Sequence, residues 1–231
     1  MSLIARNLED IRRRLAAAAE RAGRDPQEVR LVAVTKTVDL GRLKEAVAYG
    51  QTHFGENYLQ EAKAKITALG EGLTWHFIGH LQSNKAKAAV EFFHLIHSVD
   101  RLKLAQALEE AAARRGKVQD ILLQVNLAGE KTKSGAAVGD VPDLLKEIRK
   151  MPHLRVLGLM ILPPWLPDPE KVRPYFRALR ELRDKLREDG VAGELPELSM
   201  GMSGDFEVAV EEGATLVRIG TAIFGERPRK A

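Results

Sequence analysis

Eight short apolar runs recur along the chain with helical patterns between them, and this alternation constrains the fold more than any other feature. Each run has the length and composition of a buried strand. Because the runs are apolar throughout, they suit strands covered on both faces, as in a parallel sheet. The runs are LVAV (31–34), THF (52–54), WHFI (75–78), LIHSV (95–99), ILLQV (121–125), RVLGLMIL (155–162), ELSM (197–200) and TLVRI (215–219).

The segments between the runs carry apolar residues at three- and four-residue spacing, which predicts helices. The clearest example is Val172, Tyr175, Phe176, Leu179, Leu182 and Leu186. Eight strand–helix units in 231 residues predict a (β/α)8 TIM barrel. An open doubly wound sheet is the alternative, but the turn after the first run lacks the glycine-rich fingerprint of dinucleotide-binding sheets.

The two ends of the chain complete this prediction. After the eighth run only TAIFGERPRKA remains, which is too short for a full outer helix. The first residues form an amphipathic pattern through Ile4, Leu8, Ile11 and Leu15. We therefore expect an extra N-terminal helix to cover the exposed part of the barrel wall, and a single domain over residues 1–231.

Composition excludes several classes of protein. The chain has no cysteine, so it holds neither a disulfide framework nor a thiolate metal site. Lys and Arg exceed Asp and Glu by only 36 − 32 = 4, the charges are interleaved, and aromatic residues make up 5%, which argues against a nucleic-acid surface. The start lacks a secretory leader, and VLGLMIL is too short to span a bilayer. We expect a cytoplasmic protein that contacts neither membrane nor nucleic acid.

Lys36 lies directly after the first apolar run. Val32, Val34 and Lys36 share one face at the two-residue strand period. At the carboxyl end of a barrel strand, a partly desolvated lysine has a lowered pKa and can form a Schiff base. The alternative is that the strand ends there and the ammonium reaches water along its methylene stem.

Two glycine-bearing turns follow the seventh and eighth runs, where barrels commonly bind phosphate. The first, MGMSGDFEVAVEEG, contains Ser203 and Gly204, and Ser203 is expected at the start of a helix. The second contains Gly220 and Thr221, which are expected to open a helical turn. Taken singly, each is also compatible with an ordinary capped turn.

Arg218 shares a strand face with Gly220, so it is expected to point inward just beneath the mouth of the barrel. One interpretation is an arginine paired with a buried carboxylate. The other is a donor beside a ligand acceptor, between the phosphate turns and Lys36. Pyridoxal 5′-phosphate (PLP) has an aldehyde, a heterocyclic acceptor and a phosphate at that spacing.

The motifs AVTKT, HFGENYLQE, WHFIGHLQSNK, ILLQVN, GLMIL, LSMGMSGDFEVAVEEG and VRIGTAIFGER cover nearly the whole chain, and in this order they resemble the pyridoxal-phosphate homeostasis protein family. This family is related to the alanine racemase N-terminal barrel. The resemblance implies that Lys36 carries PLP as a covalent aldimine and that Arg218 faces the pyridine nitrogen. It also implies that Ser203, Gly204, Gly220 and Thr221 hold the phosphate, and that Asn57 lines the pocket.

Two functional classes follow: a protein that stores or delivers PLP in intracellular PLP homeostasis, and an amino-acid racemase or other Schiff-base enzyme. Arg218 disfavours a protonated pyridine nitrogen, which most PLP catalysis requires. Racemases also need an opposite-face tyrosine from a second domain, and Tyr49, Tyr58 and Tyr175 lie in helical segments. We therefore expect a carrier with weak or absent racemase activity. PLP-dependent apoenzymes are its expected partners, and we expect a monomer or weak dimer.

Two further patterns resemble binding sites. His76 with His80, and His94 with His97, have metal-ligand spacing but no partnering cysteine or carboxylate motif, so we expect no metal and interpret them as packing or pocket residues. The loop GEKTKSG lacks the order of a phosphate loop, and we expect its lysines, Lys131 and Lys133, to face anions at the mouth.

Overall fold

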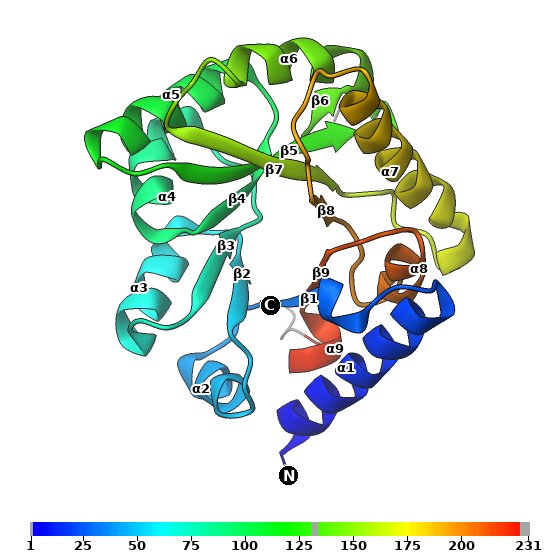
Figure 1. The fold of residues 1–231 in the computed structure, drawn as a ribbon. Coiled ribbons are helices and arrows are strands. Elements are labelled where there is room, and N and C mark those ends of the chain that lie inside the picture. Colours follow the sequence, from blue (N-terminus) through cyan, green and yellow to red (C-terminus); the bar gives the residue numbers. More distant parts are fainter. Residues whose placement is uncertain (1, 131–133, 227–231) are drawn as a thin grey trace.

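The computed structural model describes residues 2–130 and 134–226, which form a closed barrel of parallel strands inside a ring of helices (Figure 1). The strand order is β1-β2-β3-β4-β5-β7-β8-β9, and β9 pairs with β1 to complete the ring. The strands are β1 (Arg30–Val34), β2 (His53–Glu56), β3 (Thr74–Phe77), β4 (Leu95–Val99), β5 (Gln119–Asn126), β7 (Leu154–Ile161), β8 (Glu197–Ser199) and β9 (Leu216–Ile219). All eight predicted runs are strands, and the predicted barrel is confirmed.

Helices connect the strands on the outside of the barrel (Figure 1). They are α1 (Leu3–Arg21), α2 (Leu40–Ala48), α3 (Leu59–Leu69), α4 (Ala86–Phe92), α5 (Leu102–Arg114), α6 (Val141–Ile148), α7 (Arg173–Glu188), α8 (Phe206–Glu211) and α9 (Thr221–Phe224). Four short 3-10 turns precede strands or helices, at Pro26–Glu28, Ser83–Lys85, Val138–Asp140 and Pro169–Lys171. The predicted helical spacing at 172–186 corresponds to α7, whose Phe176, Leu179 and Leu186 are buried.

The two faces of the strands build separate apolar layers. Inside the ring, Val32, Leu95, Leu122, Met160 and Leu216 form a small buried cluster, and a larger cluster fills the space between strands and helices. This division follows from the two-residue strand period, because neighbouring side chains point to opposite faces. The interior is therefore a packed core, and polar side chains within it need partners.

Helix α1 lies against α8, α9 and α2, beside the short last helix (Figure 1). Its Ile4, Leu8, Ile11 and Leu15 are buried. The prediction that the N-terminal helix covers the wall next to the eighth strand is therefore confirmed. Arg14 fixes this contact from the polar side, since its NH2 donates to Glu207 on α8 at 2.7 Å.

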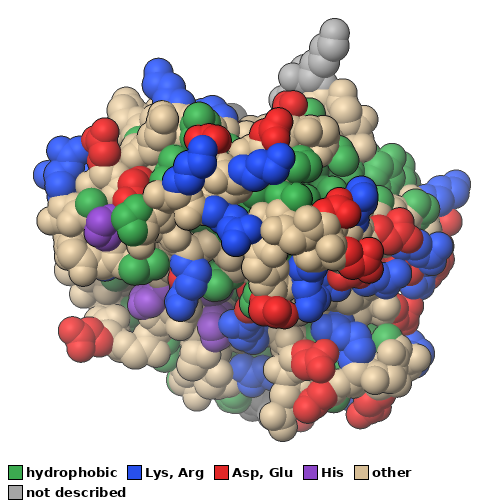
Figure 2. All heavy atoms as spheres, turned by 45° about the horizontal axis from the view of Figure 1, so that its top comes forward, with side chains coloured by type: hydrophobic (Ala, Val, Ile, Leu, Met, Phe, Trp, Pro, Cys, Tyr) green, Lys and Arg blue, Asp and Glu red, His purple; other side chains and the backbone are tan. Residues whose placement is uncertain are grey.

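A short strand that the sequence did not predict, β6 (Ala136–Ala137), pairs with the end of β5. It follows the GEKTKSG loop, whose Lys131 and Lys133 lie outside the described residues, as does the terminal RPRKA. No helix within residues 2–130 and 134–226 combines the length and apolarity needed to cross a bilayer. On the face shown in Figure 2, basic and acidic side chains are interleaved, as their order in the sequence predicts.

Candidate functional site

Lys36 occupies a tight turn immediately after β1. The N–H of Val38 donates to the carbonyl of Thr35 at 2.9 Å, and Thr37 has a φ of 63°, a conformation uncommon for residues other than glycine. Lys36 is partly buried and lines a small cavity of about 20 Å³ together with Gly220 and Thr221. The structure thus brings the predicted amine to two of the predicted phosphate residues.

A buried cluster of charged side chains from β2 and α3 is hydrogen-bonded to this turn. The ammonium of Lys65, on α3, donates to the carbonyl of Thr35 at 2.5 Å, to Glu56 at 2.7 Å and to Glu61 at 2.5 Å. The hydroxyl of Thr35 also donates to Glu56 at 2.5 Å, and Glu61 accepts from the N–H of Thr37 at 2.6 Å. Both neighbours of Lys36 are therefore tied to one cluster.

Glu56 is fully buried at the end of β2. Burial raises the pKa of its carboxyl, and the hydrogen bonds from Lys65 and Thr35 counteract part of that rise. The sequence analysis missed this cluster. The only signal for it was the i, i+4 spacing of Glu61 and Lys65, which is also common on ordinary solvated helices.

The two glycine-bearing turns lie side by side. The hydroxyl of Ser203 accepts from the N–H of Ala222, in the first turn of α9, at 3.3 Å. A Cβ on Gly220 would lie 3.3 Å from the Cβ and carbonyl oxygen of Val34, so a small residue lets β9 approach the end of β1. Gly220 and Thr221 open α9 as predicted.

The prediction that Ser203 lies at the start of a helix was wrong in detail. Helix α8 begins at Phe206 with Asp205 at its N-cap position, and Asp205 accepts from the N–H of Met202 at 2.6 Å. The shorter helix leaves Ser203 in the preceding turn, where its hydroxyl faces the backbone of α9 and not that of α8.

Arg218 is buried inside the barrel, as predicted from the strand period. Its NH1 donates to the hydroxyl of Ser199 at 2.6 Å, and its NH2 donates to the carbonyl of Ile161 at 2.8 Å. Burial lowers the pKa of Arg218 to about 10, partly offset by the charge of Asp205, so the guanidinium stays protonated near neutral pH. Among the described residues no carboxylate lies within ion-pair distance of it, so the interpretation as a buried ion pair was wrong.

Asn57 follows β2 at the same end of the barrel. Its Oδ1 is buried and has no hydrogen-bond partner within the described part of the chain. A Cβ on Gly79 would lie 2.4 Å from the carbonyl of Asn57, so only glycine allows the two loops to approach this closely. Asn57 also lines a hollow of about 560 Å³ with His80 and Tyr58, and Tyr58 is 59% exposed.

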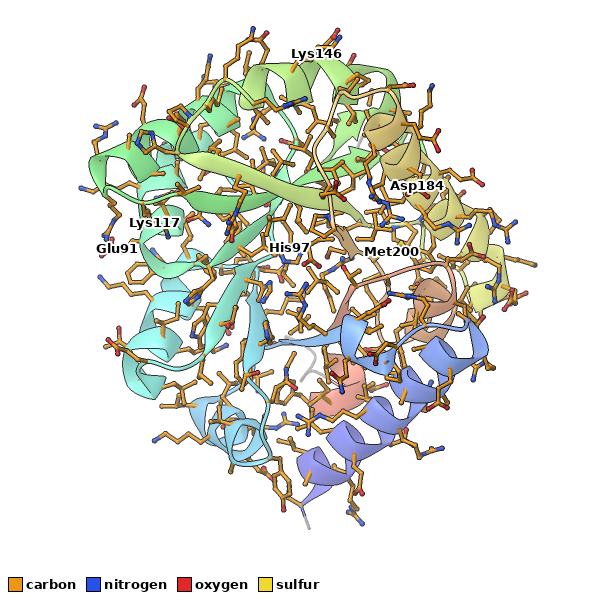
Figure 3. All side chains as sticks on the ribbon, in the orientation of Figure 1. Glu91, His97, Lys117, Lys146, Asp184 and Met200 are labelled. Carbon is orange, nitrogen blue, oxygen red and sulfur yellow. The ribbon has the colours of Figure 1, made fainter. Side chains whose placement is uncertain are left out.

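The histidines of the interior form a connected series. His53 on β2 shares a hydrogen bond of 3.0 Å with His76 on β3, which shares one of 2.9 Å with His97 on β4. His97 in turn lies 2.8 Å from the hydroxyl of Ser199 on β8, the residue that also accepts from Arg218. Figure 3 shows His97 inside the ring of strands.

The other two histidines that the sequence analysis singled out lie apart from this series. His94 accepts from the N–H of Trp75 at 3.0 Å, and the exposed His80 shares a hydrogen bond of 3.0 Å with Ser134. The two members of each pair, His76 with His80 and His94 with His97, therefore have different hydrogen-bond partners. Over residues 2–130 and 134–226, no group of three or more His, Asp or Glu side chains is arranged to hold a metal ion.

Comparison with known proteins agrees with this architecture. The family model of the alanine racemase N-terminal domain matches residues 6–228. A pyridoxal phosphate homeostasis protein of Aquifex aeolicus is 49% identical over 222 residues, which cover 95% of this chain and 96% of the relative.

Solved structures extend the comparison. PipY of Synechococcus elongatus, solved with PLP bound, has a TM-score of 0.85 and 38% identity, over 96% of this chain and all of PipY (100%). Alanine racemase of Corynebacterium glutamicum shares the fold, with a TM-score of 0.72 at 20% identity, over 98% of this chain and 62% of that one. The chain therefore belongs to the alanine racemase N-terminal domain family and, within it, to the pyridoxal phosphate homeostasis proteins.

Proposed function

We propose that this protein binds PLP at the carboxyl end of the barrel and holds it covalently on Lys36 for storage and delivery within the cell. Bound PLP supplies an aldehyde that reacts reversibly with amines. The Aquifex aeolicus relative is named a pyridoxal phosphate homeostasis protein, and PipY was solved with PLP bound. In this proposal Lys36 contributes the attached amine, and Ser203, Gly204, Gly220 and Thr221 receive the phosphate.

The observation that carries the proposal is that the buried guanidinium of Arg218 lacks some of its hydrogen-bond partners among the described residues. A guanidinium has five N–H donors, and the described residues supply acceptors for two of its nitrogens only. No carboxylate in that part of the chain lies within ion-pair distance of it, and the charge of Asp205 offsets only part of the cost of its burial. A ligand with an acceptor atom at its ring and a negative phosphate nearby supplies what this group lacks.

The remaining residues fit the same ligand. Asn57 presents an unpaired buried carbonyl oxygen, which suits a donor group on a bound molecule. The hydroxyl oxygen of Ser203 accepts from the N–H of Ala222 in α9, which leaves its own proton to donate to an anion beside Thr221. Lys36 and Thr221 line one cavity, which supports the proposal that the amine and the phosphate residues act on a single ligand.

We expect a carrier and not an efficient enzyme. Arg218 is a donor near neutral pH, and a donor beside a ring nitrogen disfavours the protonated ring that draws electrons from a substrate carbanion. Tyr49 and Tyr175 lie at the end of α2 and within α7, as predicted, and Tyr58 caps α3 in an exposed position. The tyrosine needed for racemisation thus has no evident counterpart in the described part of the chain.

Borohydride trapping tests the proposed attachment. Incubation with PLP followed by reduction is expected to label one peptide, the one that contains Lys36, because this lysine lies at the strand end beside Gly220 and Thr221. Mass spectrometry of the digested protein identifies the labelled peptide. Lys36→Ala should lose the label, whereas Lys85→Ala should keep it. A label on Lys85, Lys131 or Lys133 in the unmodified protein would refute the assignment.

Proton exchange tests the carrier role. The protein loaded with PLP is expected to exchange the α-protons of D- and L-alanine in heavy water far more slowly than the roughly 1 per second or faster of dedicated enzymes. Proton NMR follows the loss of the α-proton signal. A dedicated alanine racemase serves as the positive control, and exchange at a comparable rate would show that the protein is an enzyme.

A further inference from the structure

A series of polar side chains crosses the barrel interior and ends at Arg218. It consists of His53, His76, His97 and Ser199, which come from β2, β3, β4 and β8. His76, His97 and Ser199 are at most 2% exposed. Their hydrogen bonds, from 2.8 to 3.0 Å, are short enough that His76, His97 and Ser199 each have a definite partner on both sides.

Arg218 sets the direction in which the hydrogen bonds of this series are donated. A guanidinium can only donate, so Ser199 accepts from it. The hydroxyl of Ser199 then has one proton to donate, and within the described residues His97 is its only available acceptor. If His97 donated instead, the buried hydroxyl proton would be left without a partner. Every donor and acceptor of Ser199 therefore has a partner only if its hydroxyl donates to Nδ1 of His97.

The same reasoning sets the proton position on each ring. Burial holds the pKa values of His76 and His97 well below their ordinary range, and burial also lowers that of His53, so the rings are neutral near pH 7. A neutral His97 that accepts at Nδ1 carries its proton on Nε2 and donates to Nδ1 of His76. His76 donates in the same way to Nδ1 of His53.

Each member therefore turns its acceptor atom toward Arg218 and its donor away from it. Aligned dipoles of this kind stabilise a positive charge and polarise one another in a low-dielectric interior. The chain begins beside the Arg30–Glu197 ion pair, where His53 lines a hollow of about 240 Å³ at the amino ends of β1 and β2. At the other end the negative charge of Asp205 acts on Arg218.

We propose that Ser199, His97, His76 and His53 are positioning residues for the ring of the bound ligand, because they hold Arg218 as a charged, oriented donor beneath it with no carboxylate at ion-pair distance among the described residues. This inference rests on the proposed function, since the ring is that of PLP. It assigns a role to His76 and His97, each of which is one member of a pair with metal-ligand spacing in the sequence. The neutral side chains stabilise the guanidinium together with the charge of Asp205, in place of a carboxylate in direct contact.

A pair of ligands tests the effect on Arg218. PLP and its 1-deaza analogue, in which C–H replaces the ring nitrogen, differ only in the acceptor that Arg218 faces. The unmodified protein is expected to bind PLP more tightly. In Ser199→Ala the ratio of the two dissociation constants should fall by about tenfold, because the donor loses its orientation. Ser199→Thr, which keeps the hydroxyl, should restore the ratio.

Ser98→Ala provides a matched control. Ser98 is the next residue to His97 on β4, is 1% exposed, and its hydroxyl has no partner among the described residues. Its replacement removes a buried serine hydroxyl without changing the series of side chains from His53 to Ser199, so the ratio of the two dissociation constants should stay unchanged. An unchanged ratio in Ser199→Ala, or a fall of equal size in Ser98→Ala, would overturn the inference.

Nitrogen NMR of the unmodified, PLP-loaded protein provides a test that needs no variant. His53, His76 and His97 are expected to carry their protons on Nε2, with unprotonated Nδ1 atoms. A proton on Nδ1 of His97 would overturn the inference. Reductive trapping of PLP on Lys36 in the same sample separates the two proposals. A labelled Lys36 together with a proton on Nδ1 of His97 would refute only the role of the histidine series. An unlabelled Lys36 would refute the proposed function and this inference with it.

Discussion

Replacing both Ser203 and Thr221 by alanine is expected to weaken the binding of PLP by roughly 3 to 6 kcal/mol, because two hydrogen bonds to a charged phosphate are lost. The two hydroxyls belong to turns that the structure places together, since Ser203 contacts the backbone of Ala222, next to Thr221. The effect should be absent for pyridoxal, which has no phosphate. Titration calorimetry with both ligands measures the difference.

Thr67→Ala is a suitable control for the phosphate variant, because Thr67 is exposed on the outer helix α3. It should leave the affinity for both ligands unchanged. An equal loss of affinity for PLP and pyridoxal in the double variant would mean that the two hydroxyls shape the pocket without contacting the phosphate, and the proposed phosphate site would be wrong.

Lys65→Met is expected to lower the free energy of unfolding by about 3 to 5 kcal/mol, because it leaves a fully buried carboxylate without its cation. Glu56 would keep only the hydroxyl of Thr35 as a partner, and one of its oxygens already has none among the described residues. The turn around Lys36 should loosen as well, since Lys65 donates to the carbonyl of Thr35. Urea denaturation measures the stability.

Two further variants separate the causes of that loss. Lys65→Met combined with Glu56→Gln should recover part of the stability, because no unpaired charge then remains in the core. Lys146→Met removes an exposed ammonium from α6 (Figure 3). Because this ammonium pairs with the exposed Asp143, the variant should change the stability by no more than about 0.5 kcal/mol. A loss in Lys65→Met as small as in Lys146→Met would show that the cluster does not hold the turn.

The class of fold and the end of the barrel where the candidate site lies could be predicted from the sequence alone. Fully apolar runs at regular intervals allow few arrangements other than strands covered on both sides, and eight of them close a barrel. The strand period also showed that Arg218 points inward, and the apolar pattern at Ile4 to Leu15 identified the covering helix. These conclusions depend only on the spacing of apolar residues within one segment, which can be read without knowing how the segments pack.

Which inward-pointing residues contact one another could not be predicted in this way. The strand period tells which face a side chain occupies, but not the stagger between neighbouring strands, which closure of the barrel sets. For this reason the sequence could not show that Arg218 bonds to Ser199 and the carbonyl of Ile161, or that His53, His76 and His97 form one chain. The hydrogen bond from Lys65 to the turn of Lys36 could not be predicted for the same reason. It joins α3 to the end of β1, and the spacing of residues within one segment does not indicate contacts between segments.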